Sequence, residues 1–398
     1  MPTLATPKDC TGCSACYNIC PHDAITISSN AEGFLMPDID YNKCIECRLC
    51  EKACPIVNQI NLKYPEAEDA YAFWDNETRT KSSSGGAFSA IARWVIDNGG
   101  VVFGAAWTED GFHCQHKMCT NVEELADLRG SKYLQSDIRK TFREAREALR
   151  NDRYVLFTGT PCQIAGLRSF LLKPFDRLIT VDIVCHGVPS NNLFFNYIKK
   201  LILEYPKYKN AFAFSFRNLQ GWGYAPTLKI SERESKILVG IPNIYMGAFE
   251  KAAIFRESCY NCKFNGISRT GDITIADFWG IGMQEIPFHQ DVTEGVSLVL
   301  INTEKGRVIF KSLENCFIEK RPIKEALKYN HNLVSSSSRP NFREKAIISF
   351  NDPEISLKEI NDKFNFVGRG WKAFVRNTLI KTGIFWTIKS LINKYRSL

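Results

Sequence analysis

No uncharged apolar run in the sequence approaches the roughly 18 to 20 residues that a helix needs to cross a bilayer. The sequence therefore predicts no membrane-spanning segment. It also shows no secretory leader ahead of Cys10, so we expect a protein of the reducing cytoplasm, where disulfides are rare. At 398 residues the chain is too long to be a miniprotein held by disulfides, and about two to three domains are expected.

The chain has no acidic residue from Lys363 onward, although eight basic residues lie there. The rest of the chain holds 43 basic and 43 acidic residues, so the formal charge of +8 belongs to this tail. A nucleic-acid-binding protein would need basic residues interleaved with exposed aromatic residues on its body. The neutral body therefore argues against a nucleic-acid partner.

Cysteine, by contrast, is abundant. Of the 15 cysteines, eight form two copies of the pattern C-x2-C-x2-C-x3-C-P, 34 positions apart. Three thiolates at this spacing can surround one face of an iron–sulfur cube, with backbone N–H groups free to donate to the sulfides. A zinc site would leave the triple spacing unexplained, because structural zinc sites normally pair two CxxC turns. The first copy contains Cys10, Cys13, Cys16 and Cys20, and the second contains Cys44, Cys47, Cys50 and Cys54.

Residues 1–60 resemble a bacterial-type ferredoxin that holds two 4Fe-4S clusters. In such ferredoxins the fourth cysteine of each copy binds the other cluster. The resemblance implies one cluster on Cys10, Cys13, Cys16 and Cys54, and a second cluster on Cys44, Cys47, Cys50 and Cys20.

Beyond a polar linker at 58–68, helix-like and strand-like segments alternate. This alternation predicts an α/β domain with a mixed or parallel sheet. Helices are expected at residues 87–97, 137–150, 163–172 and 192–203, and strands at 101–107, 154–158 and 178–184. Further strand-like runs lie at 212–216, 273–276 and 296–301, and we interpret the serine run 335–338 as the end of the compact body.

Six short segments in this part carry the residues of a candidate site. They are SSSGG (82–86), GSKYLQS (130–136), GTPCQ (159–163), DIVCHGVPS (182–190), CYNC (259–262) and GDITIADFWG (271–280). Glycines before a helix let a phosphate approach its free N–H groups, although such a pair is more often only a turn. GTPCQ and DIVCHGVPS follow predicted strands, and ligands commonly bind at the carboxyl ends of strands in α/β sheets.

Four further cysteines lie in these segments, beside turns rich in glycine or proline. Four is the number that another cubane cluster requires, whereas a single CxxC pair is ambiguous among zinc, a redox dithiol and a cluster. The four are Cys162, Cys185, Cys259 and Cys262.

In this order the six segments resemble the family of beta subunits of coenzyme F-420 (8-hydroxy-5-deazaflavin) hydrogenases and dehydrogenases, over residues 66–330. The resemblance implies an α/β domain in two parts, a flavin-binding part at 66–150 and a part at 151–330 with the substrate and a third 4Fe-4S cluster. That cluster would be held by Cys162, Cys185, Cys259 and Cys262. The flavin, FAD, would lie against Ser84, Gly85, Gly86, Gly130, Ser131, Lys132, Tyr133 and Gln135.

Three side chains are candidates for a catalytic role. Lys132 would offset phosphate charge or stabilise an anionic reduced flavin, and otherwise it is a solvated surface lysine. His186 is either a proton donor near neutrality or a packed turn residue. Asp277 is a candidate for substrate contact together with Arg217 and Trp222, although such residues are more often structural.

Residues 331–398 are expected to form a linker and a basic amphipathic helical tail. Apolar residues recur at helical spacing between positions 371 and 395, lysines and arginines occupy other faces, and Gly383 is the expected break. Such a helix is typical of attraction to an anionic membrane surface. The alternative is a helix that docks on the body or on a partner protein.

The expected molecule is a multidomain protein of the α+β and α/β classes, with a ferredoxin-like domain, a flavin-binding α/β domain and a helical tail. It would be an oxidoreductase whose clusters relay single electrons to or from FAD, which exchanges a hydride with an organic substrate. The family resemblance leaves this substrate open between coenzyme F-420 and a sugar or lipid-linked intermediate, because members with short basic tails occur in bacterial surface-polysaccharide gene sets.

The expected partners are a ferredoxin or reductase, the organic hydride donor or acceptor, and an anionic membrane surface that the tail would contact from the cytoplasmic side. The alternative function is an electron-transfer adaptor subunit without a substrate of its own. An adaptor would show clusters and flavin but no open cavity over the flavin ring.

Overall fold

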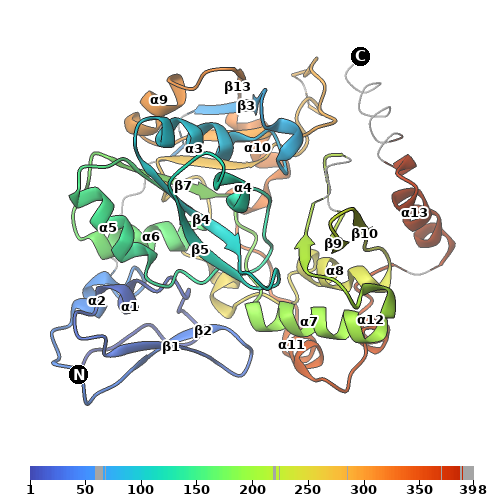
Figure 1. The fold of residues 1–398 in the computed structure, drawn as a ribbon, viewed down its shortest axis with the longest axis horizontal. Helices are drawn as coiled ribbons and strands as arrows, with labels where there is room; N and C mark the ends of the chain where they lie inside the picture. Colours follow the sequence, from blue (N-terminus) through green and yellow to red (C-terminus); the bar gives the residue numbers. More distant parts are fainter. Residues whose placement is uncertain are drawn as a thin grey trace.

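The computed structural model describes residues 1–58, 66–67, 69–217, 221–223, 225–284, 286–368, 370–385 and 388. Three parts of the chain pack together, namely a small N-terminal domain, a central sheet layered with helices, and a helical lobe beside the sheet (Figure 1). Most of the linker that we expected at 58–68 lies outside the described residues.

The N-terminal domain consists of two short helices and one antiparallel hairpin. Each helix follows a residue with left-handed backbone, Ser14 or Arg48, and ends at a cysteine, Cys20 or Cys54. The two copies of the cysteine pattern therefore fold as two similar turn-and-helix units. The elements are α1 (Ala15–Ile19), β1 (Ile25–Ser29), β2 (Leu35–Ile39) and α2 (Leu49–Ala53).

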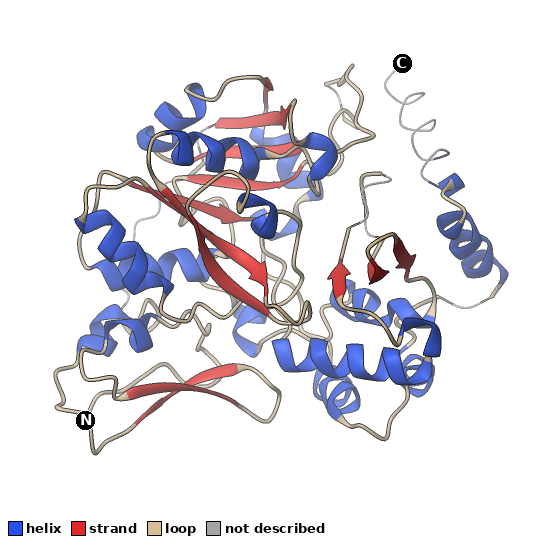
Figure 2. Ribbon diagram, viewed as in Figure 1, coloured by secondary structure: helices blue, strands red, loops and turns tan. Residues whose placement is uncertain are grey.

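The central sheet contains eight strands in the described part of the chain, in the order β13-β3-β12-β11-β7-β6-β4-β5 (Figure 2). The pairs β4–β6, β6–β7 and β7–β11 are parallel and the other neighbours are antiparallel, so the sheet is mixed. The strands are β3 (Asp69–Asp75), β4 (Val101–Trp107), β5 (Cys114–Cys119), β6 (Val155–Gly159), β7 (Leu178–Ile183), β11 (Ile273–Asp277), β12 (Ser297–Ile301) and β13 (Cys316–Arg321).

Helices cover both faces of the sheet. On one face, α5 (Thr141–Arg150) and α6 (Pro161–Leu171) form an apolar cluster with the sheet, and α1 of the N-terminal domain packs against the same cluster. On the other face, α3 (Ala87–Asp97) and α9 (Glu304–Lys311) form a separate apolar cluster. The N-terminal domain is therefore an additional layer that lies on α5 and α6 (Figure 1).

Local sequence signals explain where α6 begins. Pro161 occupies the first turn, where its missing N–H costs nothing, and Thr160 and Gln163 form a reciprocal capping box. The helix therefore starts at the carboxyl end of β6 and places Cys162 in its first turn. The expected helix at 163–172 thus begins two residues earlier.

The helical lobe lies beside the sheet and has its own apolar cluster. Its elements are α7 (Asn191–Glu204), a small sheet of β8 (Ala213–Ser215), β9 (Thr227–Ser231) and β10 (Glu234–Ile237), α8 (Ile244–Glu250), α11 (Arg343–Asn351) and α12 (Leu357–Phe364). Two shorter helices, α4 (Leu125–Leu128) and α10 (Ile323–Tyr329), pack near the sheet.

The interpretation of the serine run as the end of the compact body is wrong. Helices α11 and α12 follow that run, and Ile347, Phe350 and Ile360 of these helices are buried in the core of the lobe. The serine run is instead a loop within the body. The amphipathic pattern after it was obscured because the polar loop and Pro340 resemble a boundary.

Most other expected elements agree with the structure to within a few residues, and α3 and β4 agree at both ends. The expected helix 137–150 begins only at Thr141, because Arg139 has a left-handed backbone (φ 52°) that a helix cannot include. Strands β3, β5, β9, β10 and β13 were not expected from the sequence.

The tail begins with α13 (Trp371–Lys381), which projects beside the lobe (Figure 1). Ile380 is buried on one face of this helix, whereas Trp371 and Phe374 are 72% and 71% exposed. The break expected at Gly383 is present, since α13 ends two residues before it and its φ is 77°. The rest of the expected amphipathic helix, residues 389–398, lies outside the described residues.

Candidate functional site

The eight N-terminal cysteines form two groups, each around a small cavity of about 20 Å³. We call them the proximal set (Cys10, Cys13, Cys16, Cys54) and the distal set (Cys20, Cys44, Cys47, Cys50). In each group, the first three cysteines of one copy of the pattern lie with the fourth cysteine of the other copy. This is the grouping that the ferredoxin resemblance implied. None of the 15 cysteines, all of which the structure describes, is in a disulfide.

Burial differs between the two sets. Cys10 and Cys13 of the proximal set are buried, and burial together with the neighbouring Cys54 raises the pKa of the Cys13 thiol far above its usual range. Cys47 of the distal set is exposed. Packed thiols of this kind are costly to ionise unless a cation compensates their charge, which is what iron provides. The distal set is thus the one nearer to solvent.

The four remaining motif cysteines also converge, and we call them the core quartet. Cys162 lies in the first turn of α6, and Cys185 follows the carboxyl end of β7. Cys259 lies within a short 3-10 helix, η4 (Glu257–Asn261), and Cys262 directly follows it. Burial raises the pKa of Cys162 to about 12, and the charges of Cys262 and Cys259 contribute to this shift. Burial and the other three thiols likewise raise the pKa of Cys185 well above its usual range.

In the described part of the chain, no three His, Cys, Asp or Glu side chains adopt the arrangement of a site for a single metal ion. A 4Fe-4S cluster binds four thiolates on four different irons, and so needs thiolates grouped around a larger volume. The residue chemistry of all three cysteine groups fits such clusters.

The serine run 335–338 makes hydrogen bonds to the backbone next to the core quartet. The Ser336 hydroxyl donates to the Tyr260 carbonyl, 2.9 Å away between the two cysteines of the CxxC turn. The Ser337 hydroxyl donates to the carbonyl of His186, 2.6 Å away and next to Cys185. This loop therefore ties together two of the segments that carry the quartet.

The proximal set and the core quartet lie on neighbouring sides of the start of α6. Cys162 is in the first turn of this helix, and Gly166 follows one turn later. A Cβ atom at Gly166 would lie 2.9 Å from Sγ of Cys13, so only glycine allows this approach. The charge of Cys162 also contributes to the raised pKa of Cys13.

A cavity of about 300 Å³ opens at the carboxyl ends of β6, β7 and β11. Of the predicted site residues, Ser84, Gly86, Gly130, Ser131, Lys132, Tyr133, His186 and Asp277 line it. Cys185 also lines it, so the cavity and the core quartet share a wall.

The residues of this cavity fit a dinucleotide such as FAD. The N-terminus of α3 faces it, and Gly86 at the start of that helix has a left-handed backbone (φ 89°). The buried hydroxyl of Ser84 has no hydrogen-bond partner among the described residues, which leaves it available to a ligand. A Cβ atom at Gly130 would meet nothing within 4 Å, so this loop leaves open space.

Two predicted flavin contacts, Gly85 and Gln135, do not line the cavity. A Cβ atom at Gly85 would lie 2.1 Å from the carbonyl oxygen of Phe73, so this glycine permits close packing on β3. The buried Gln135 amide donates to the Thr11 carbonyl at 2.9 Å and accepts from Arg256 Nε at 3.0 Å. Its side chain connects the N-terminal domain to the sheet domain instead.

Lys132 lies in the cavity wall, but its ammonium group is directed toward the end of α4. Nζ donates to the carbonyls of Asp127, Leu128 and Arg129 at 2.9 to 3.2 Å. Burial lowers the pKa of Lys132 to about 8, and the nearby Cys114 opposes this shift. The lysine thus places a positive charge near the cavity while it caps a helix.

Asp277 lies at the end of β11, lines the cavity and pairs with the buried Arg217, which does not line the cavity. Its carboxylate accepts from Arg217 Nη2 at 2.5 Å and from Trp222 Nε1 at 2.6 Å. Arg217 Nε in turn donates to the Tyr133 hydroxyl at 2.9 Å, and Trp222 stacks on Trp279. Arg217 and Trp222 therefore meet the ADFWG segment in space. His186 is exposed at the cavity and packs near Phe249.

Sequence reasoning missed His116, a buried residue of β5 that lines the cavity. Its Nε2 donates to the Thr158 carbonyl and its Nδ1 accepts from the Ser136 hydroxyl, both at 2.9 Å. Burial lowers its pKa to about 4, so the imidazole is neutral at physiological pH. The residue could have been found only if β5 had been recognised as a strand that faces the cavity.

The fold and the cysteine groups define an iron–sulfur redox protein, and the comparisons with known proteins agree. Residues 9–58 match the 4Fe-4S dicluster domain. Residues 70–143 and 152–326 match the N-terminal and C-terminal models of the coenzyme F420 hydrogenase/dehydrogenase beta subunit, which together cover well over half of the chain. The chain belongs to this family of beta subunits.

Curated relatives include a coenzyme F420-dependent sulfite reductase of Methanocaldococcus jannaschii, 22% identical over 77% of this chain and 46% of the relative. One subunit of the F(420)H(2) dehydrogenase of Methanosarcina mazei is 27% identical over 43% of this chain and 51% of the relative. The chain thus spans about half the length of these relatives. A solved F420-reducing [NiFe] hydrogenase complex from Methanosarcina barkeri contains a chain that is 15% identical, with a TM-score of 0.46 over 71% of this chain and 99% of the other.

No helix within the described residues combines the length and the apolar character that a membrane span requires.

Proposed function

We propose that the chain is an iron–sulfur flavoenzyme in which the three cysteine groups each hold a 4Fe-4S cluster and the cavity holds FAD. The observation that carries this proposal is the position of Cys185, which belongs to the core quartet and also lines the cavity. A flavin in the cavity would lie beside the ligands of the core cluster. FAD supplies the chemistry that joins single-electron carriers to hydride exchange with an organic substrate.

Different residues around the cavity would contact different parts of the flavin and the substrate. The Ser84 hydroxyl and the N–H groups at the start of α3 are suited to the pyrophosphate. The charge of Lys132 would favour the phosphates or an anionic flavin ring, although its ammonium group also caps α4. Asp277, which lines the cavity and is fixed by the buried Arg217, would contact the substrate. The exposed His186 would exchange protons with solvent.

We propose a deazaflavin such as coenzyme F-420, or a sugar or lipid-linked intermediate, as the organic substrate. The names of the relatives support a deazaflavin. A ferredoxin or reductase would exchange electrons at the distal set, where Cys47 is exposed. The second candidate function, an electron-transfer adaptor, is favoured by the naming of one relative as a subunit, but the open cavity favours an enzyme.

Anaerobic purification of the full chain tests this function. We expect about twelve irons, about twelve inorganic sulfides and about one FAD per chain, as three 4Fe-4S clusters and one flavin require. About eight irons would remove the core quartet from the proposal, and a protein without flavin would refute the assignment of the cavity. An adaptor would be supported if the reduced flavin were reoxidised by a ferredoxin but by no organic acceptor.

We also propose that the tail binds an anionic membrane surface, on the cytoplasmic side if the protein is cytoplasmic. Trp371, Phe374 and Val375 share an exposed apolar face of α13, and the tail carries eight basic residues and no acidic one. Anionic lipids attract such a segment by about 1 kcal/mol per basic residue near the surface. Ile380, on the opposite face of the helix, is buried and would not take part in this contact.

Cosedimentation with vesicles checks the role of the tail. The full chain should sediment with vesicles that contain phosphatidylserine, whereas a chain that ends at Gly368 should remain in solution. The Trp371→Ala/Phe374→Ala variant should bind at least about tenfold more weakly, because it loses the apolar anchor and keeps the charge. Binding that is equal for the full and the shortened chain would contradict a membrane role, and vesicles of neutral lipid provide the control.

A further inference from the structure

The segment that leads into the CxxC turn of the core quartet is bound to the N-terminal domain by buried side chains. Arg256 is 2% exposed, and its Nη1 donates to the carbonyl of Cys10 at 2.9 Å while its Nη2 donates to that of Leu35 at 2.5 Å. The Ser258 hydroxyl donates to the same Cys10 carbonyl at 3.1 Å. The backbone of one proximal cysteine is therefore held by the residues just before Cys259.

The contact between these segments is close enough to restrict the residue types on both sides. Gly12, which lies between Cys10 and Cys13, has a left-handed backbone (φ 67°), and a Cβ atom there would lie 2.6 Å from Nη2 of Arg256. The guanidinium of Arg256 also lies over the ring of Phe34, 5.1 Å from its centroid. Arg256 is thus enclosed between the loop of the proximal set and the hairpin.

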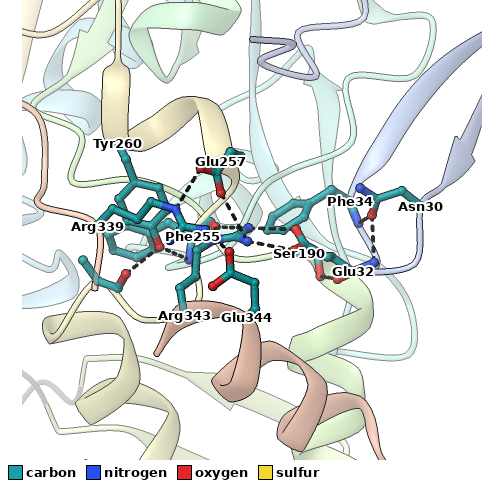
Figure 3. A network of polar contacts seen from close by, with 11 residues as sticks. Asn30, Glu32, Phe34, Ser190, Phe255, Glu257, Tyr260, Arg339, Arg343 and Glu344 are labelled. Carbon is teal, nitrogen blue, oxygen red and sulfur yellow. Dashed lines mark hydrogen bonds and ion pairs between the residues drawn. The ribbon is translucent and has the colours of Figure 1, made fainter. Parts of the chain in front are cut away.

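A second buried arginine comes from α11, beyond the serine run. Arg343 is 1% exposed and forms a bidentate ion pair with Glu32, with Nη1–Oε1 and Nη2–Oε2 distances of 2.7 and 2.8 Å (Figure 3). The same guanidinium donates to the Phe255 carbonyl at 2.8 and 2.9 Å and lies 3.3 Å from Glu257 Oε2. Arg343 therefore joins the hairpin to the segment that Arg256 also holds.

The hairpin tip is shaped to enter this contact. The Asn30 side chain accepts from the backbone N–H groups of Glu32 and Phe34, which closes the turn without help from the rest of the protein (Figure 3). A Cβ atom at Gly33 would lie 2.7 Å from Cβ of Asn192, at the start of α7. The tip thus presents Glu32 to Arg343 while Phe34 is buried beneath Arg256.

We propose that Arg256 and Arg343 are positioning residues of an interdomain clamp that fixes the proximal set against the core quartet. The proposal rests on the proposed function, because the separation of the two sets matters only when both hold clusters. Electron exchange between two such centres falls steeply as they move apart, so a clamp that removes domain motion keeps the exchange within one chain.

The Glu32→Gln variant of the full chain tests the clamp, because Glu32 lies on the hairpin and its loss leaves the core of α11 intact. We expect hydrogen exchange of the backbone amides at 30–36 to rise by about tenfold or more, since a bidentate ion pair between the buried Arg343 and the partly exposed Glu32 is lost. We also expect weaker magnetic interaction between the reduced clusters in electron paramagnetic resonance spectra, with unchanged iron content. Arg343→Lys keeps the positive charge but not the two parallel N–H donors of the guanidinium. Its hydrogen exchange at 30–36 should therefore be faster than in the wild type and slower than in Arg343→Met.

The matched control is Asp38→Asn, which removes an exposed carboxylate from the same hairpin and should leave both measurements as in the wild type. Equal exchange of residues 30–36 in the wild type and in Glu32→Gln would overturn the clamp, whatever the iron content. A wild-type protein with only about eight irons would instead overturn the proposed function, and the exchange measurement would still decide whether the clamp exists.

Discussion

Replacement of Cys185 by alanine is expected to remove about four irons from each chain and leave about eight, because a cubane that loses one of four thiolates in a solvent-accessible wall is not retained. The spectra of the two clusters proposed for the N-terminal domain should persist, since the eight cysteines that would bind them lie in a separate domain. Because Cys185 also lines the cavity, reduction of the flavin by an external ferredoxin should slow by at least about a hundredfold, or about 2.7 kcal/mol in the barrier.

Cys316→Ala provides the control for this experiment. Cys316 is a partly exposed cysteine on β13 with no assigned role, and it lies outside all three cysteine groups. Its replacement should leave the iron content and the rate of flavin reduction unchanged. Equal iron content in Cys185→Ala and in the wild type would show that the core quartet does not bind a cluster.

The largest expected effect on stability comes from Asp182→Asn. Asp182, on β7, is fully buried, and its carboxylate pairs with the buried guanidinium of Arg269 at 3.2 Å. It also accepts hydrogen bonds from the backbone N–H groups of Thr270 and Gly271 and from the hydroxyls of Thr270 and Thr274. Both carboxylate oxygens accept from donors. In either orientation, the amide of an asparagine would therefore direct its N–H₂ group at another donor. The guanidinium of Arg269 would also lose the negative charge with which it pairs.

Removal of one partner from a buried ion pair typically costs about 3 to 5 kcal/mol, and we expect the unfolding free energy to fall by this amount. The measurement is the midpoint of urea-induced loss of secondary structure under anaerobic conditions. Asp176→Asn, at an exposed position just before β7, should change the stability by less than about 0.5 kcal/mol. Similar midpoints for the two variants would mean that the carboxylate of Asp182 does not hold the loop at 269–271 to the sheet.

The predictions agree best with the structure where a short stretch of neighbouring residues determines the local fold. The spacing of the N-terminal cysteines determines which side chains a tight turn can bring together, and the groups around the two small cavities follow from it. Helix α3 is equally local, because the Gly85-Gly86 pair marks its start and an apolar face runs from Ala87 to Val95. The family motifs likewise identified most of the residues that line the main cavity.

The disagreements arise where distant parts of the chain decide the outcome. Gln135 lies in a motif next to cavity residues, but its side chain turns away because Arg256 and the Thr11 carbonyl supply its partners. His116 was missed because β5 carries polar residues that give no clear strand pattern. Helices α11 and α12 were missed because a serine run resembles a boundary, whereas here the same serines hydrogen-bond to the segments of the core quartet.

The ion pair between Glu32 and Arg343 joins residues that are 311 positions apart. It cannot form during translation until Arg343 has left the ribosome, long after the cysteines of the N-terminal domain have emerged. Until then, the N-terminal domain and its eight cysteines lack this contact with α11. Among the contacts of the clamp, those of Arg343 are therefore the last that can form, after those of Arg256.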